Sequence, residues 1–289
     1  MTNKLSDNGL IKAEDLYFML GGKEPIKILD ATYALPGAGK PFDAFLQRHI
    51  KGAQFFDIDV VADQESSLPH MLPTAEYFAA CVSALGISNT DHIVIYDQSG
   101  LYMASARAWW MFRTFGHKNV YVLDGGMLAW VKGGYTTESG PVEAPAPTDF
   151  KASFRPELVV SKNDLLTNLK TGKIKVLDAR PAARYDGTAP EPRAGMRAGH
   201  IPNSANFPFT MMLDPHTRVF VDNQTINEMF MSVGIDEKEN VAASCGSGVT
   251  ACTIALGAFK ARQQEIAIYD GSWTEWGAEN ADTPIEVSA

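Results

Sequence analysis

The chain has 289 residues, a formal net charge of −9 and 45% apolar residues. This length suits two domains, and the apolar content suffices for two buried cores. The acidic balance argues against nucleic acid or an anionic membrane as the main partner, because both are themselves negatively charged. No apolar run approaches the roughly 20 residues that cross a bilayer, and residues 1–7 lack a signal core, so we expect a cytoplasmic protein.

Short apolar runs alternate along the chain with stretches of helical period. Runs of this length, bounded by turn residues, are typical of buried parallel strands. The expected strands cover residues 26–29, 93–96, 120–123, 174–177, 241–243 and 266–269. The expected helices cover residues 77–85, 104–115, 162–170, 226–233 and 249–260. The alternation predicts an α/β fold.

Four sequence blocks recur in the two halves of the chain in the same order. The first copy contains Asp30, His49, Asp97 and Trp130, and the second contains Asp178, His200, Cys245 and Trp276 at matching places, 146–151 residues later. This register predicts a duplicated domain, each copy a mainly parallel sheet flanked by helices. Residues 139–148 are rich in proline and lack periodicity. We therefore predict an N-terminal domain over residues 1–138, a linker over 139–153 and a C-terminal domain over 154–289.

Only the second copy has a thiol in its third block. Cys245 follows an expected strand and precedes an expected helix, in the segment Ser244-Cys245-Gly246-Ser247-Gly248-Val249-Thr250-Ala251. Glycines let backbone N–H groups converge on one point, and the positive end of the helix adds to them, which makes an anion-binding nest. A thiolate is favoured there, so Cys245 is the predicted nucleophile. The alternative is a packed thiol, which is the interpretation we give to Cys81 and Cys252 in their apolar helical stretches.

Cysteine phosphatases also hold a thiolate between a strand and a helix. They place an Arg six residues after the cysteine, where this chain has Ala251. Without that guanidinium, bidentate recognition of a phosphoryl group is missing, so phosphatase activity is not expected.

The chain resembles tandem-domain rhodanese-type sulfurtransferases over essentially its whole length. The resemblance rests on the two fused domains, on the cysteine in the second alone, and on four segments: Arg48-His49-Ile50-Lys51-Gly52-Ala53, Phe55-Phe56-Asp57-Ile58-Asp59, Leu123-Asp124-Gly125-Gly126 and Cys245-Gly246-Ser247-Gly248-Val249-Thr250-Ala251. Family members that use thiosulfate generally have basic residues at the two positions after the cysteine. Those that use 3-mercaptopyruvate have Gly-Ser, as does this chain at Gly246-Ser247.

The resemblance implies an enzyme that moves the sulfur of 3-mercaptopyruvate through a Cys245 persulfide to a thiol such as thioredoxin, or to cyanide, and releases pyruvate. It implies no metal and no organic cofactor. Arg184 and Arg193 fall where this branch binds the substrate carboxylate, for which a guanidinium is suited. Their alternative is a solvated surface pair.

Further roles implied by the resemblance concern the loop and the first domain. Ser247 is expected to donate to the substrate or relay a proton, while backbone N–H groups from Gly246 through Gly248 and Val249 to Thr250 hold negative charge. Some members place a Ser–His–Asp arrangement at the domain interface. His49 matches the family position for orienting or protonating Ser247, and Asp43 is the candidate acid.

Three alternatives stay open at this point. His49 and its counterpart His200 are otherwise explained as residues that only begin a turn. For the whole protein, the alternatives are a thiosulfate sulfurtransferase and a non-catalytic sulfur-relay or binding module.

Overall fold

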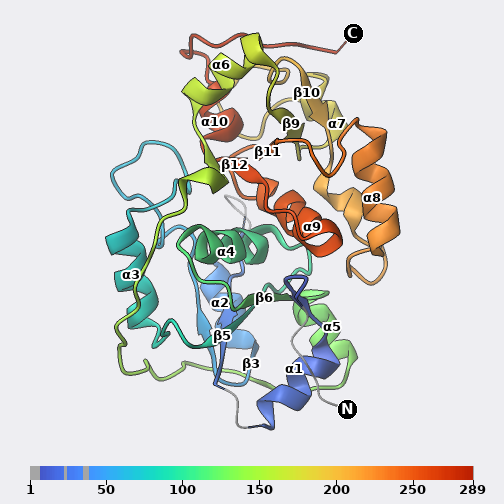
Figure 1. The fold of residues 1–289 in the computed structure, drawn as a ribbon. Coiled ribbons are helices and arrows are strands. Elements are labelled where there is room, and N and C mark those ends of the chain that lie inside the picture. The colour runs from blue at the N-terminus through green and yellow to red at the C-terminus, as the bar shows by residue number, and fades with distance from the viewer. Residues whose placement is uncertain (1–6, 23–24, 35–38, 289) are drawn as a thin grey trace. The chain divides into compact units, whose positions relative to one another are not determined.

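The computed structural model describes residues 7–22, 25–34 and 39–288. The six N-terminal residues of the segment that lacks a signal core thus lie outside the described residues. The chain divides into two compact units (Figure 1): unit 1 comprises Met1–Gln64, Leu72–Arg155 and Leu213–Phe220, and unit 2 comprises Glu65–Met71, Pro156–Met212 and Val221–Ala289. Within the described ranges, none of the helices has the length and apolar character to span a membrane.

Unit 1 is built on a five-stranded parallel sheet in the order β1-β6-β5-β2-β4. Its strands are β1 (Leu10–Ile11), β2 (Ile26–Asp30), β4 (Ala53–Phe55), β5 (His92–Tyr96) and β6 (Val120–Leu123). Its helices are α1 (Ala13–Leu20), α2 (Pro41–Gln47), α3 (Ala75–Ala84), α4 (Met103–Thr114) and α5 (Gly126–Lys132). A separate antiparallel pair joins β3 (His49–Ile50) to β7 (Thr137–Glu138).

Unit 2 has a second five-stranded parallel sheet, in the order β10-β9-β11-β12-β8. Its strands are β8 (Val159–Val160), β9 (Lys175–Asp178), β10 (Ser204–Asn206), β11 (Val241–Ser244) and β12 (Ala267–Tyr269). Its α-helices are α6 (Lys162–Thr171), α7 (Ala182–Tyr185), α8 (Asn223–Ser232), α9 (Ala251–Arg262) and α10 (Ser272–Trp276), with 3-10 turns η1 (Pro156–Leu158) and η2 (Phe209–Met212).

The two sheets have the same strand order when the repeats are aligned. The series β4, β2, β5, β6, β1 in unit 1 corresponds to β10, β9, β11, β12, β8 in unit 2. This confirms the prediction of two α/β domains, each a mainly parallel sheet flanked by helices. The predicted strands are present to within about one residue at each end. The short strands β1, β3, β4, β7, β8 and β10 were not predicted, because two or three residues carry no periodic signal.

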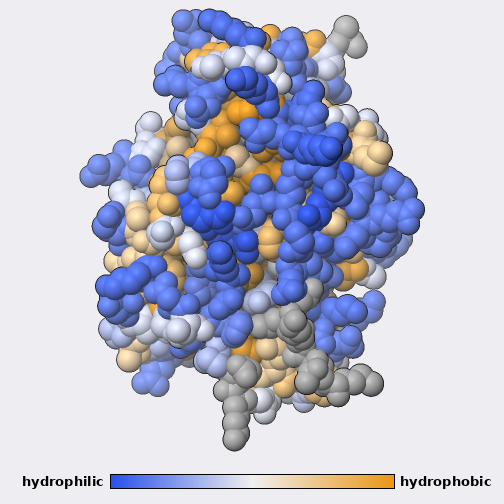
Figure 2. All heavy atoms as spheres, in the orientation of Figure 1, coloured by the Kyte–Doolittle hydropathy of each residue, from blue (hydrophilic) through white to orange (hydrophobic). Residues whose placement is uncertain are grey.

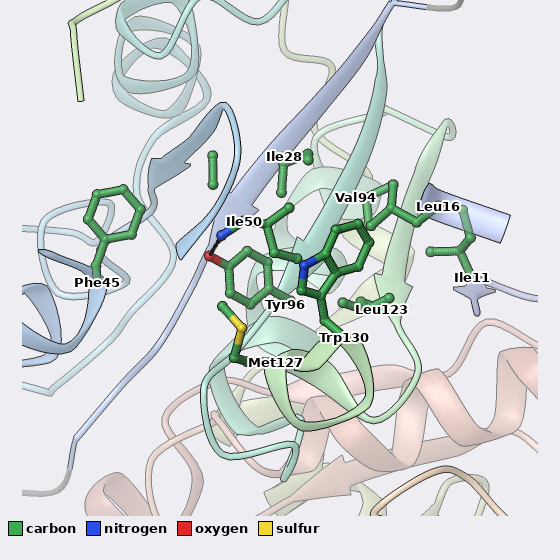
Figure 3. Close-up of a cluster of buried hydrophobic side chains, with 11 residues drawn as sticks. Ile11, Leu16, Ile28, Phe45, Ile50, Val94, Tyr96, Leu123, Met127 and Trp130 are labelled. Atoms are coloured by element: carbon green, nitrogen blue, oxygen red, sulfur yellow. Dashed lines mark hydrogen bonds between the residues drawn. The ribbon is translucent and has the colours of Figure 1, made fainter. Parts of the chain in front are cut away.

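Each unit has its own apolar core. In unit 1, Ile28, Val94 and Tyr96 from the sheet pack with Trp130 of α5, and the Tyr96 hydroxyl accepts the N–H of Ile50 at 3.1 Å (Figure 3). In unit 2, a corresponding cluster gathers Val160, Leu165, Val176, Ile201, Ala242, Ala267, Tyr269, Trp273 and Trp276. Hydrophilic side chains cover most of the face drawn in Figure 2.

The segment predicted as a linker is hydrogen-bonded along unit 1. The Thr148 N–H donates to the Ser83 carbonyl at 3.0 Å, and the Phe150 N–H donates to the Ser83 hydroxyl at 2.9 Å. Lys151 N–H and carbonyl both bond to the Asn89 side chain. The segment is therefore fixed to one unit over much of its length and is not a free tether.

Candidate active site

The loop of residues 245–250 connects the end of β11 to α9, and Cys245 in it is 2% exposed. Its first two carbonyls are bonded to the start of α10: Cys245 O accepts from Trp273 N at 3.0 Å and Gly246 O from Thr274 N at 2.9 Å. In a trans peptide the N–H points opposite to the carbonyl. The N–H groups of Gly246 and Ser247 therefore point away from α10.

Ser272, at the start of α10, holds the two ends of this loop together. Its buried hydroxyl oxygen accepts the N–H groups of Cys245 and Gly248, each at 3.1 Å, and its proton is donated to the Tyr269 carbonyl at 2.8 Å. Gly248 has φ +74°, which favours glycine there. Because its N–H is engaged by Ser272, Gly248 shapes the loop instead of offering a donor. Among the described residues, the N–H groups of Gly246, Ser247, Val249 and Thr250 have no acceptor.

In the corresponding loop of unit 1, the Asp97 side chain accepts the hydrogen bonds that hold the loop. Asp97 Oδ1 accepts from Gly100 N at 2.7 Å and from the Ser99 hydroxyl at 2.8 Å, while its Oδ2 accepts from the Ser105 hydroxyl at 2.7 Å. The position matching Ser272 is Gly126, where a Cβ would lie 2.6 Å from the Asp97 carbonyl oxygen. The N–H groups of Gly100 and Gly248, which occupy matching positions, thus both have an acceptor. In unit 1 it is the Asp97 carboxylate within the loop, and in unit 2 it is the Ser272 hydroxyl outside the loop.

Two further side chains line the cysteine loop. Ser247 is 7% exposed, and its hydroxyl forms no hydrogen bond with any residue that the structure describes. Cys252 is fully buried, and its thiol donates to the Gly248 carbonyl at 3.2 Å, so it contacts the loop in addition to packing. Cys81 was predicted to be buried but is only partly so.

Arg184 lies against the cysteine loop from the end of α7. A Cβ built on Gly246 would approach its Nη2 to 3.2 Å. Its Nε and Nη2 both donate to Oε2 of Glu191, the former at 3.1 Å. Arg193, on the following segment, is partly exposed and makes no ion pair or hydrogen bond with the described residues. Of the two arginines predicted to bind the substrate carboxylate, the structure thus places the side chain of Arg184 against the cysteine loop.

Sequence reasoning missed a buried charged network behind Arg184. Arg180 is 1% exposed, bonds Asp178 through Nε and Nη2 and donates Nη1 to Glu191 Oε1 at 2.7 Å, and its guanidinium lies over the ring of Trp273 at 4.3 Å. Burial opposes the charge of this side chain, but Asp178 and Glu191 outweigh that effect and raise the pKa of Arg180. A signal was present, since Asp178-Ala179-Arg180 replaces Asp30-Ala31-Thr32 of the first repeat.

His49 is buried in unit 1 with a fixed tautomer. Its Nδ1 lies 2.9 Å from the Phe45 carbonyl, which only accepts, so Nδ1 carries the proton and Nε2 is the basic nitrogen. The imidazole also stacks on the Phe45 ring, 4.4 Å between centroids. His200 repeats both contacts on Tyr185. Asp43, the candidate acid, forms no hydrogen bond with His49 within the part of the chain that the structure describes.

Comparisons with known proteins give relatives over most of the chain. Residues 12–133 and 161–279 match the family model described as Rhodanese-like domain. The human 3-mercaptopyruvate sulfurtransferase is 43% identical over 258 residues, 88% of this chain and 85% of that protein. The thiosulfate sulfurtransferase of Bos taurus is 41% identical over 253 residues, 87% and 84% of the two chains. The crystal structure of SseA from Escherichia coli, presented as a 3-mercaptopyruvate sulfotransferase with the rhodanese fold, has a TM-score of 0.82 at 35% identity and covers 92% of this chain and 99% of its own.

Proposed function

The chain belongs to the rhodanese-like family, and on that premise we propose that it is an enzyme transferring the sulfur of 3-mercaptopyruvate, through a persulfide on Cys245, to an acceptor. Pyruvate is the other product. The relatives named above carry the general activity, which is sulfur transfer on this fold. The choice of donor and the roles of individual residues depend on the loop.

The observation that carries the proposal is the position of Arg184 beside Gly246. Its guanidinium approaches the residue next to the nucleophile, which suits a substrate whose carboxylate lies a few bonds from the sulfur under attack. A side chain larger than hydrogen at position 246 would compete with Arg184 for this space. Gly246 is therefore explained by the room it leaves for the arginine, since its own backbone is outside the left-handed region.

The first step is attack of the Cys245 thiolate on the sulfur of 3-mercaptopyruvate. A sulfur–sulfur bond forms and the carbon–sulfur bond breaks, so the electron pair leaves with the carbon and pyruvate departs as its enolate. The unengaged N–H groups of Gly246, Ser247, Val249 and Thr250 bind the anionic sulfur, supported by the N-terminus of α9. The Ser247 hydroxyl relays the proton of the substrate thiol to the enolate, which leaves the outer sulfur of the persulfide anionic, and Arg193 assists Arg184 at the carboxylate.

The second step passes the outer sulfur of the persulfide to a thiol such as thioredoxin, or to cyanide, and restores the Cys245 thiolate. His49 is proposed as a proton carrier, because its protonated Nδ1 leaves Nε2 as the basic nitrogen. Neither step requires a metal or an organic cofactor. We place this chemistry in the cytoplasm, where thiols are kept reduced.

Thiosulfate is the second candidate donor, because a relative named for it is almost as similar as the relatives named for 3-mercaptopyruvate. Overall identity does not separate the two. The loop favours 3-mercaptopyruvate, since positions 246 and 247 hold glycine and serine and supply no cation for a small dianion.

The test measures pyruvate release from 3-mercaptopyruvate with a small thiol as acceptor, together with the intact mass of the protein after donor alone. We expect turnover, and a mass increase of one sulfur atom that maps to the peptide containing Cys245. Cys245→Ser should lose both, while Cys81→Ser on α3 should keep both. A wild-type protein with a higher kcat/KM for thiosulfate than for 3-mercaptopyruvate would refute the donor assignment.

A further inference from the structure

Glu191 is a buried carboxylate shared by two arginines. Its side chain is 5% exposed, with Oε1 accepting from Arg180 Nη1 at 2.7 Å. Its Oε2 accepts from both Nε and Nη2 of Arg184, whose side chain is 23% exposed. The Nε–Nη2 edge of the Arg184 guanidinium is thus fixed by Glu191, and Nη2 is also the atom that a Cβ on Gly246 would meet at 3.2 Å.

The side of Glu191 that faces away from the loop is rigidly anchored. Arg180 is held by both oxygens of Asp178, by the Gly199 carbonyl at 2.9 Å and by the ring of Trp273. Buried charged groups with several partners of this kind keep a single arrangement, because any displacement leaves a charge unpaired in a low dielectric. Because Arg180 holds Glu191 in one position, Glu191 in turn fixes the position of the Arg184 guanidinium.

The charges in this cluster cancel before Arg193 is added. Asp178 and Glu191 balance Arg180 and Arg184, and Arg193 has no ion-pair partner among the described residues. Together with Arg193, which follows Glu191 by two residues in the chain, these groups have an excess of one positive charge, which equals in magnitude the charge on the single carboxylate of 3-mercaptopyruvate. A dianion such as thiosulfate would need a larger excess.

We propose that Glu191 is a positioning and specificity-determining residue, which orients Arg184 toward the donor's carboxylate and, by its charge, disfavours dianionic donors. This assignment rests on the proposed function. Loss of the carboxylate has two separable effects: Arg184 loses its orientation, and the excess charge rises from one to two. The first effect weakens use of 3-mercaptopyruvate, whereas the second favours thiosulfate, because a dianion gains about twice as much as a monoanion from an added unit charge.

Three variants separate position from charge. Glu191→Gln keeps the shape and removes the charge, and Glu191→Asp keeps the charge and shortens the reach to Arg184. Glu228→Gln is the matched control, an exposed carboxylate on α8 whose one partner among the described residues is the Gln224 side chain, which donates to it at 2.8 Å. Steady-state kcat/KM is measured for 3-mercaptopyruvate and for thiosulfate at low and high ionic strength, with cyanide as the common acceptor.

For Glu191→Gln we expect the ratio of kcat/KM for 3-mercaptopyruvate to that for thiosulfate to fall tenfold or more, since one charged hydrogen-bond network is broken, which typically costs at least about tenfold. The gain for thiosulfate should shrink at high salt. Glu191→Asp should lower kcat/KM for 3-mercaptopyruvate without raising that for thiosulfate, and Glu228→Gln should leave the ratio unchanged.

A folded Glu191→Gln protein with the wild-type donor ratio overturns the role of Glu191 and leaves the proposed function standing. If Glu191→Gln does not fold, wild-type kcat/KM for 3-mercaptopyruvate in Glu191→Asp overturns it equally. A wild-type protein that releases no pyruvate overturns the proposed function itself, and the assignment of Glu191 with it.

Discussion

Removing the Ser272 hydroxyl should destabilise unit 2 by a predictable amount. The oxygen accepts two buried N–H groups, those of Cys245 and Gly248, and Ser272 is itself fully buried. A buried donor left without an acceptor costs about 1–3 kcal/mol. The space vacated by one oxygen atom does not hold a water molecule that could replace it. Ser272→Ala should therefore lower the free energy of unfolding by about 3 kcal/mol.

Two companion variants make this measurement specific. Ser272 has φ +47°, so Ser272→Gly loses the same hydroxyl but relieves left-handed strain and should be about 1 kcal/mol more stable than the alanine variant. Ser99→Ala is the comparison in unit 1: this exposed hydroxyl accepts the Leu101 N–H and donates to Asp97 Oδ1 at 2.8 Å, bonds that water can replace, so its loss should lower the free energy of unfolding by about 1 kcal/mol or less. Urea unfolding followed by circular dichroism gives all three values. A loss below about 1 kcal/mol in Ser272→Ala would mean that the loop is not held by this hydroxyl.

Three more predictions follow from the same structure. Arg184→Ala and Arg193→Ala should each raise KM for 3-mercaptopyruvate roughly ten- to a hundredfold with a smaller change in kcat. Lysine at either position should restore only part of the lost affinity. Unchanged KM in both alanine variants would place the substrate carboxylate elsewhere. Replacing Gly246 and Ser247 with Arg and Lys should shift donor preference toward thiosulfate, partly because a side chain at 246 displaces Arg184, and an unshifted preference would contradict this. Burial lowers the pKa of His117, so the stabilising contribution of this histidine is present above the unfolded pKa of about 6.5 and is lost as pH falls, by at most about 1.4 kcal/mol per pH unit. His117→Gln should flatten the dependence of the unfolding free energy on pH, measured by urea titration between pH 7.5 and 5.5. Identical slopes for the wild type and the variant would be evidence against this prediction.

The sequence was sufficient for the repeat, the class of fold and the position of Cys245 in a loop between a strand and a helix. These depend on local signals, such as apolar runs of strand length and a glycine-containing turn between a strand and a helix, which tertiary structure leaves intact. The long helices α4 and α9 were predicted to within two residues at each end for that reason. The short strands β1, β3, β4, β7, β8 and β10 were missed, because two or three residues pair only when a neighbouring strand is already in place.

The support around the nucleophile was beyond sequence reasoning for a different reason. Ser272 lies 27 residues after Cys245 and meets it only because β11 and β12 are neighbours in the sheet. Glu191 gave no signal of its own, since a glutamate in a proline-rich segment is usually solvated, and only the fold buries it between Arg180 and Arg184. Spacing alone also suggested that both glycines were needed for loop curvature, whereas Gly246 has φ outside the left-handed region and leaves room for the Arg184 guanidinium.

The two ways of satisfying the loop N–H have a consequence for the history of the duplicated chain. In unit 1, Asp97→Cys by itself would leave the Gly100 N–H without its acceptor, and Gly126→Ser by itself would place a Cβ 2.6 Å from the Asp97 carbonyl oxygen. Asp97→Cys is unfavourable unless another acceptor is already in place, and Gly126→Ser requires the backbone to shift whichever side chain occupies position 97. A chain with Asp97 therefore reaches a second thiol loop only through at least two substitutions and a backbone shift, so hydrogen bonding and steric exclusion keep the two copies different.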